Sequence, residues 1–249
     1  MVTLSMTSML NVIQSAPTLQ NLPGDGSHNA PQPPLDEYYN SLFTAFGPQH
    51  WWPGKTPFEV IVGAILTQNT SWTNVEAAIS NLRRARLLSP RAIRSAPLAQ
   101  LRRLLRPSGY FRQKARKLKA FCDFLYADYG GSLKRMFATP TIALRPKLLA
   151  IWGIGPETAD SILLYAGGHE VFVVDAYTRR LLARHGWIAD AAKAKYDDIR
   201  WLFERRFPSD QERYNEFHAL IVRAGKQYCF ARDPRCEVCP LQRYLQEGR

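Results

Sequence analysis

Residues 148–160, LLAIWGIGPETAD, decide the fold, because two glycines there flank one apolar residue between two helix-forming runs. Gly153 and Gly155 can adopt backbone angles that crowd a side chain, and they allow another molecule's backbone to approach closely. Pro156 is favoured at the first position of a helix. The unpaired amides and the positive dipole end of such a helix suit a phosphate. An isolated pair of glycines more often marks an ordinary turn between core helices, so the rest of the chain has to decide.

The charge of the chain favours a polyanionic partner. Its 249 residues include 33 Lys and Arg against 21 Asp and Glu, a net charge of +12. An excess of this size is typical of proteins that bind nucleic acid. Between Arg83 and Lys119 there are thirteen basic residues and no Asp or Glu. A solvated helix face rarely excludes acids over such a length, so we expect a polyanion-binding surface.

Cysteine content and hydropathy point to a soluble protein inside the cell. Four cysteines are too few for a disulfide scaffold. No apolar run approaches the ~18 residues of a membrane span, and the first residues do not resemble a secretory signal. We therefore expect a cytoplasmic protein that uses no membrane.

The periodicity of apolar residues predicts an all-α protein. Residues 1–34 are rich in Ser, Thr, Asn, Pro and Gly and read as a flexible tail. Apolar residues then recur at helical spacing. Only residues 171–174 look strand-like, and they are too few to imply a sheet. The expected helices cover about 35–46, 56–66, 71–86, 90–95, 97–105, 112–129, 145–152, 157–165, 175–185, 195–206 and 211–228.

The glycine pair is accompanied by four other motifs in a fixed order. They are PFE at 57–59, LTQNT at 66–70, GYF at 109–111 with KA at 114–115, and VD at 174–175. From about Pro57 onward, this order and spacing resemble the helix-hairpin-helix DNA glycosylase superfamily, to which endonuclease III belongs. WWP at 51–53, RPSGY at 106–110 and VVD at 173–175 are similar in particular to the branch called 3-methyladenine DNA glycosylase III.

The resemblance implies a two-lobed helical fold around a DNA-facing cleft. One lobe would combine residues 35–56 with about 170–249. The other would hold about 57–169, with the hairpin at 148–165. A damaged base would be flipped out of double-stranded DNA into the cleft, because its sugar bond is out of reach inside the duplex. We expect the protein to act as a monomer.

The resemblance implies that Asp175 is the catalytic residue. Cleavage of an N-glycosidic bond builds positive charge on the sugar, which a fixed carboxylate stabilises. Asp175 would also cap a helix that begins at Ala176. Relatives that cut the strand carry a lysine where this chain has Glu157, and a carboxylate cannot form a Schiff base. We therefore expect a glycosylase without this lyase activity.

The resemblance also suggests residues that contact DNA and the base. The hairpin residues Gly153, Ile154, Gly155 and Thr158 would grip the DNA backbone. Gln68 matches the position that fills the stack in relatives, although it could equally cap the end of its helix. A cationic flipped base would stack on aromatic rings, so a base pocket is expected at Trp51, Trp52, Pro53 and Trp72, the alternative being that these tryptophans fill the core.

The C-terminal cysteines match three of the four ligands of the family's 4Fe–4S loop. Cys229, Cys236 and Cys239 have the expected spacing, but the fourth ligand would fall at Leu245. Four thiolates usually hold such a cluster. The sequence leaves open a cluster with a non-cysteine or exogenous fourth ligand, a zinc ion, or an empty loop, and we favour the structural cluster.

These observations predict a monofunctional DNA glycosylase of base excision repair. No obvious acid stands ready to protonate the leaving base, so the substrate should be one that leaves easily, such as the positively charged 3-methyladenine. The alternatives are an endonuclease III-like glycosylase for other damaged bases and a DNA-binding relative without catalysis.

Overall fold

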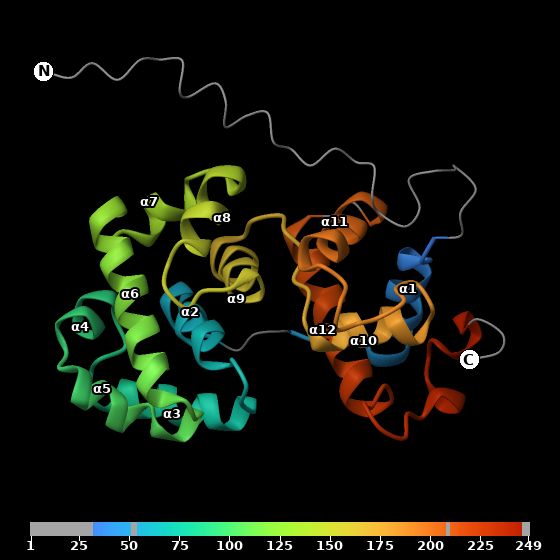
Figure 1. Ribbon diagram of the computed structural model, residues 1–249, viewed down its shortest axis with the longest axis horizontal. Helices are drawn as coiled ribbons and strands as arrows, with labels where there is room; N and C mark the ends of the chain where they lie inside the picture. Colours follow the sequence, from blue (N-terminus) through green and yellow to red (C-terminus); the bar gives the residue numbers. More distant parts are fainter. Residues whose placement is uncertain (1–31, 51–53, 208–209, 246–249) are drawn as a thin grey trace, which may run out of the picture. The chain divides into compact units, whose positions relative to one another are not determined.

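The computed structural model describes residues 32–50, 54–207 and 210–245, which form helices joined by turns and loops and include no strand, and this confirms the all-α prediction (Figure 1). The described residues from Leu35 onward form one unit. Most of the predicted tail, residues 1–31, lies outside the described part of the chain, and so do Trp51, Trp52 and Pro53 of the predicted base pocket.

The α-helices are α1 (Leu35–Phe46), α2 (Pro57–Leu66), α3 (Trp72–Arg84), α4 (Pro90–Ser95), α5 (Leu98–Leu104), α6 (Phe111–Tyr129), α7 (Leu133–Phe137), α8 (Thr141–Leu149), α9 (Pro156–Ser161), α10 (Ala176–Arg184), α11 (Tyr196–Arg206) and α12 (Gln211–Gln227). Shorter 3-10 turns are η3 (Arg106–Ser108), η5 (Cys236–Val238) and η6 (Gln242–Tyr244), and η4 (Ile162–Ala166) is a π-helical turn.

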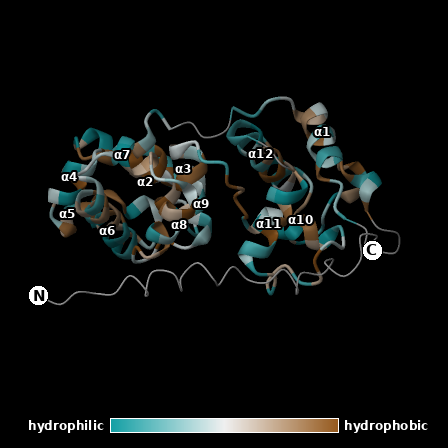
Figure 2. Ribbon diagram, turned by 90° about the horizontal axis from the view of Figure 1, so that it is seen from above, coloured by the Kyte–Doolittle hydropathy of each residue, from teal (hydrophilic) through white to brown (hydrophobic). Residues whose placement is uncertain are grey.

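Helix α2 is the buried centre of the middle segment. All its residues from Phe58 to Leu66 are buried, as its nearly continuous apolar sequence predicts. The Thr56 side chain accepts a hydrogen bond from the Glu59 amide and Pro57 occupies the first turn, which fixes where the helix begins. Contacts from α3, α6, α9 and η4 surround it. Figure 2 shows hydrophobic residues along α2 and the helices packed on it.

The terminal helices pack on one another. Helix α12 contacts both α1 and α10, although α1 and α12 are far apart in the sequence. Aromatic side chains fill much of this interior, including Phe172 and Phe203, whose ring centroids are 3.9 Å apart. Contacts between α12 and η4 join the terminal helices to the segment that follows the hairpin.

Three details differ from the sequence-based prediction. The short α7 was not expected, and α8 begins at Thr141 and continues through Pro146, where the prediction placed its start near Arg145. The helix after the hairpin changes to a π-helical turn from Ile162 to Ala166. Local sequence gives little signal for such changes, because packing against neighbouring helices decides them.

No helix in the described part of the chain has the length and apolarity needed to span a membrane.

Candidate active site

The hairpin joins α8 to α9 and presents its glycines to solvent. Gly153 has φ of 81°, in the left-handed region, whereas Gly155 is extended with φ of −94°. Ile154 between them is only 5% exposed and anchors the turn to the core. Pro156 opens α9, as predicted. The turn therefore leaves the backbone of both glycines accessible while its apolar residue is buried.

Gln68 lies against this hairpin. Its Nε2 atom donates to the Thr158 hydroxyl at 2.8 Å and more weakly to the Gly153 carbonyl at 3.4 Å, while the Lys117 ammonium donates to its Oε1 atom. The structure thus brings three of the predicted DNA-contacting residues together. Thr158 is 6% exposed, so its hydroxyl serves Gln68 and not the solvent. Gln68 would have to release these bonds before it could enter a base stack.

Of the predicted base pocket, only Trp72 can be placed. It is the first residue of α3 and is partly buried against the hydrophobic core. This position is compatible with both the pocket and the core-filling interpretation, and its role stays a prediction.

Asp175 caps α10, as the sequence predicts. Its Oδ1 atom accepts hydrogen bonds from the amide and the hydroxyl of Thr178, at 2.8 and 3.0 Å. Its side chain is 13% exposed. Burial by itself raises the pKa of this carboxyl, but the charge and hydrogen bond of His218, together with the bonds from Thr178, outweigh that effect and lower the pKa. Asp175 is therefore an ionised carboxylate held in one orientation.

His218 connects Asp175 to a tyrosine. Its Nε2 atom lies 3.5 Å from Asp175 Oδ2, and its Nδ1 atom lies 2.6 Å from the Tyr165 hydroxyl. His218 is 5% exposed on α12, and Tyr165 lies on η4. His218 is packed in the interior. What the sequence did not reveal is that it faces the carboxylate.

Glu157 lies in the first turn of α9, close enough to Asp175 for the two charges to interact. Desolvation by the surrounding protein and then the negative charge of Asp175 raise its pKa, while His218 and Arg179 act in the opposite direction. The two carboxyls therefore differ: the environment favours the charged form of Asp175 and disfavours the charged form of Glu157.

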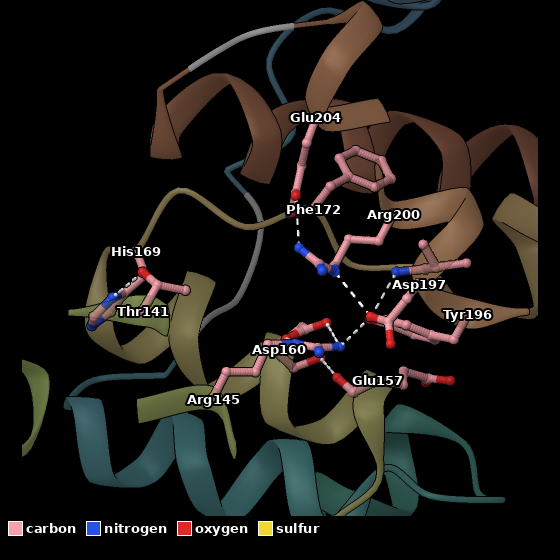
Figure 3. Close-up of polar contacts among 12 residues, drawn as sticks. Thr141, Arg145, Glu157, Asp160, His169, Phe172, Tyr196, Asp197, Arg200 and Glu204 are labelled. Atoms are coloured by element: carbon pink, nitrogen blue, oxygen red, sulfur yellow. Dashed lines mark hydrogen bonds and ion pairs between the residues drawn. The ribbon is translucent and has the colours of Figure 1, made fainter. Parts of the chain in front are cut away.

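Charged side chains of α8, α9 and α11 form an ion network around Arg145 (Figure 3). Arg145 of α8 donates to both carboxylate oxygens of Asp160, at 2.7 and 3.1 Å, and to Asp197 at 2.7 Å. The Asp160 side chain is fully buried. The Tyr196 side chain lies close enough to Asp160 to affect the pKa of that carboxyl, and its hydroxyl accepts a hydrogen bond from the Val174 amide at 3.2 Å. The hairpin and Asp175 are thus tied through consecutive polar contacts.

Sequence reasoning missed Arg145, Asp160, Tyr165 and Tyr196. Each is a common residue in a helix, and its partner lies on another helix. Only the position of Asp160 just before the apolar run ILL at 162–164 gives a signal, because a charge that is buried requires a partner.

The three C-terminal cysteines line one small pocket. Arg184, His185 and Leu245 are among its other lining residues. The Arg184 guanidinium lies 2.9 Å from the Cys229 sulfur. Burial raises the pKa of the Cys236 and Cys239 thiols. In the described residues, no three His, Cys, Asp or Glu side chains are arranged to hold a single metal ion. The donor chemistry nevertheless suits an iron–sulfur group, because thiolates are its usual ligands.

Comparisons with known proteins agree with this architecture. Residues 62–208 match the HhH-GPD superfamily of base excision DNA repair proteins, and residues 229–244 match the iron–sulfur binding domain of endonuclease III. A candidate DNA repair glycosylase of Methanocaldococcus jannaschii is 47% identical over 208 residues, covering 83% of this chain and 93% of the relative.

Two solved structures have the same fold. The Helicobacter pylori 3-methyladenine DNA glycosylase bound to 1,N6-ethenoadenine is 30% identical, with a TM-score of 0.66 over 78% of this chain and 95% of that one. A non-covalent endonuclease III–DNA complex is 24% identical, with a TM-score of 0.70 over 86% of this chain and 92% of that one. The chain belongs to the HhH-GPD superfamily of base excision DNA repair proteins and is a DNA glycosylase of the endonuclease III type.

Proposed function

We propose that the protein is a monofunctional DNA glycosylase that removes alkylated purines such as 3-methyladenine from double-stranded DNA. The observation that carries this proposal is the oriented, ionised carboxylate of Asp175 beside Glu157, at the position where a Schiff-base lysine would stand. The ethenoadenine-bound relative adds support, because its ligand is also an alkylated purine.

The proposed reaction is hydrolysis at the C1′ carbon of the flipped nucleotide. The bond from C1′ to the base nitrogen breaks, and the electron pair leaves with the base. Asp175 stabilises the positive charge that develops on the sugar and orients a water molecule, whose oxygen forms the new bond to C1′. The proton of that water is released to solvent or to the departing base, leaving an abasic site.

Asp175 would act as part of a monomer that grips the DNA backbone with the hairpin. The cysteine pocket would hold a 4Fe–4S cluster through Cys229, Cys236 and Cys239. The cluster would supply structural support to the loop between α12 and η6 and would take no part in bond cleavage.

The proposal is tested with duplexes that each carry one modified base, incubated with the purified full chain and analysed with and without hot alkali. We expect strand breaks at 3-methyladenine only after alkali, and no covalent complex on borohydride treatment. Nicking without alkali, or borohydride trapping, would contradict the monofunctional assignment. Release of oxidised or mismatched pyrimidines in place of alkylated purines would favour the other glycosylase class, and tight binding without release would identify a DNA-binding protein.

The two glycines of the hairpin allow folding and DNA binding to be separated. A Cβ atom at Gly155 would meet nothing within 4 Å, and its backbone is extended. We expect Gly155→Ala to leave the unfolding midpoint unchanged but to weaken binding to abasic-site duplex roughly tenfold, about the loss of one charge-assisted hydrogen bond. Fluorescence anisotropy would measure the affinity.

Gly153→Ala is the matched comparison. It places a side chain at φ of 81° and within 2.6 Å of the Lys117 side chain. We expect a loss of about 1–2 kcal/mol of stability from the left-handed conformation alone. Equal losses of stability in the two variants would contradict the assignment of Gly155 to the DNA-facing side.

Removal of His218 should change the pH dependence of base release. Its charge and hydrogen bond lower the pKa of Asp175, so His218→Gln should raise that pKa. Asp175 is active when ionised and loses activity as the pH falls through its pKa. The acidic limb of the rate profile should therefore move to higher pH.

Single-turnover rates measured across the acidic range give this profile. His169→Gln is a suitable control, because His169 is also hydrogen-bonded, to Thr141 at 2.8 Å, and packs against Phe137. A profile in His218→Gln that keeps its shape and only drops in height would show that His218 serves packing alone.

A further inference from the structure

The cysteine pocket contains a place for a fourth donor that the sequence pattern leaves empty. The family pattern puts the fourth cysteine at position 245, and Leu245 does line the pocket beside Cys229, Cys236 and Cys239. Residue 245 therefore lies where the fourth ligand is expected, but the leucine side chain has no electron pair to donate to a metal. Any fourth protein ligand has to come from elsewhere in the wall.

Among the wall residues, His185 carries the imidazole nitrogen, the donor that replaces thiolate in some iron–sulfur clusters. It is the C-cap of α10 and is 4% exposed. Its Nδ1 atom lies 2.7 Å from the Tyr38 hydroxyl and 3.3 Å from the Tyr244 carbonyl oxygen. Its Nε2 atom makes no hydrogen bond to any residue in the described part of the chain, although the ring lines the pocket. His185 is therefore a buried imidazole in the wall of the cysteine pocket, with one ring nitrogen held by hydrogen bonds and the other without a hydrogen bond among the described residues.

The contacts of Nδ1 suit that role. A metal-bound histidine commonly donates its second ring N–H to a backbone carbonyl, which fixes the tautomer and the ring orientation. With the proton on Nδ1, the Tyr244 carbonyl and the Tyr38 oxygen are available as acceptors, and Nε2 keeps its electron pair. The neighbouring Arg184 cannot bind a metal, because it is a cation, and it already contacts the Cys229 sulfur.

We propose that His185 Nε2 is the fourth protein ligand of an iron–sulfur cluster held by Cys229, Cys236 and Cys239. This inference rests on the proposed cluster and not on the proposed glycosylase chemistry. A cluster uses four ligands on four different iron atoms, so these ligands need not converge as closely as four ligands of one ion. Replacing a thiolate by a neutral imidazole removes one negative charge from the site, and this raises the reduction potential of such clusters.

The test uses the full chain, purified without oxygen, with iron and acid-labile sulfide measured chemically. Pulsed electron paramagnetic resonance of the reduced protein should detect a ¹⁴N nucleus bound directly to the cluster. That coupling should be absent in His185→Cys, which keeps the iron and sulfide of the wild type. His185→Ala should lose iron to a chelator more than about tenfold faster than the wild type.

Two variants separate ligand loss from general destabilisation. Tyr38→Phe removes the same buried hydrogen bond but leaves Nε2 in place, so it should keep its iron and its ¹⁴N coupling. Leu245→Cys in the His185→Ala background should restore iron retention, because it supplies the thiol of the family pattern. Base release by each variant is measured in a separate assay. Iron content and nitrogen coupling test the ligand proposal even if the protein releases no base.

The proposal is overturned if the wild type lacks directly bound nitrogen or contains no iron and sulfide. Stoichiometric zinc in place of iron would also overturn it. Equal iron loss from Tyr38→Phe and His185→Ala would show that the histidine only supports the fold.

Discussion

Asp175→Asn is expected to abolish base release while leaving the fold and the DNA affinity intact. The substitution removes the negative charge that would face the developing positive charge on the sugar, and a single such electrostatic contact is worth on the order of 10²–10³ in rate. Asparagine is nearly as good a helix N-cap as aspartate. The hydrogen bonds from Thr178 should therefore persist, and α10 should begin where it does now.

Single-turnover release of 3-methyladenine measures the rate, and anisotropy on abasic-site duplex measures the affinity. Asp210→Asn is a matched control, because Asp210 caps α12 through the Arg213 amide at 2.8 Å and takes no part in the proposed site. Unchanged release by Asp175→Asn would refute the catalytic role. A parallel loss of stability in both variants would mean that Asp175 matters only as a cap.

Asp160→Asn should have the largest effect on stability, a loss of about 3 kcal/mol. Asp160 is fully buried and receives two hydrogen bonds from Arg145, whose own side chain is 14% exposed. Removing one member of a buried ion pair leaves the other charge under-compensated, which typically costs about 3–5 kcal/mol. Arg145 keeps its contact with Asp197, so we expect the lower end of that range.

Urea unfolding measures this loss as a lower midpoint with an unchanged slope. Asp197→Asn is the control: it contacts the same Arg145, but its side chain is 42% exposed, so its loss should be worth about 0–1 kcal/mol. Equal effects of the two substitutions would contradict the importance of burial. The Asp160 variant should also release base more slowly, because the weakened Arg145 contact loosens α9 next to Tyr196, whose hydroxyl holds the Val174 amide before Asp175.

The elements that sequence predicts well are those encoded within one turn of chain. Pro156 specifies the start of α9, Thr56 and Pro57 specify the start of α2, and Asp175 specifies the cap of α10. In each case, the residue that carries the signal contacts backbone only a few positions away. The order of the motifs then added the family, which no single motif could supply.

The surroundings of Asp175 could not be predicted in this way. His218 lies on α12 and Tyr165 on η4, and nothing near either residue in the chain marks it as a partner of a carboxylate. The same is true of Gln68, which the sequence places at a helix end but which lies against the hairpin through Thr158. His185 gave no sequence signal either, because its meaning depends on the wall of the cysteine pocket.

The sequence by itself determined most of the helices, the hairpin, the position of the Asp175 carboxylate, and the presence of Glu157 where the strand-cutting relatives carry a lysine. Local propensity, capping and backbone freedom act over a few residues, and they are fully present in the order of amino acids. Only the tertiary structure decided what surrounds the Asp175 carboxylate. His218 favours the charged form of this carboxylate, and polar contacts of Arg145, Asp160 and Tyr196 connect the hairpin helix to the backbone just before it. Burial and electrostatic interactions depend on distance in space, and side chains on separate helices acquire those distances only when the helices pack.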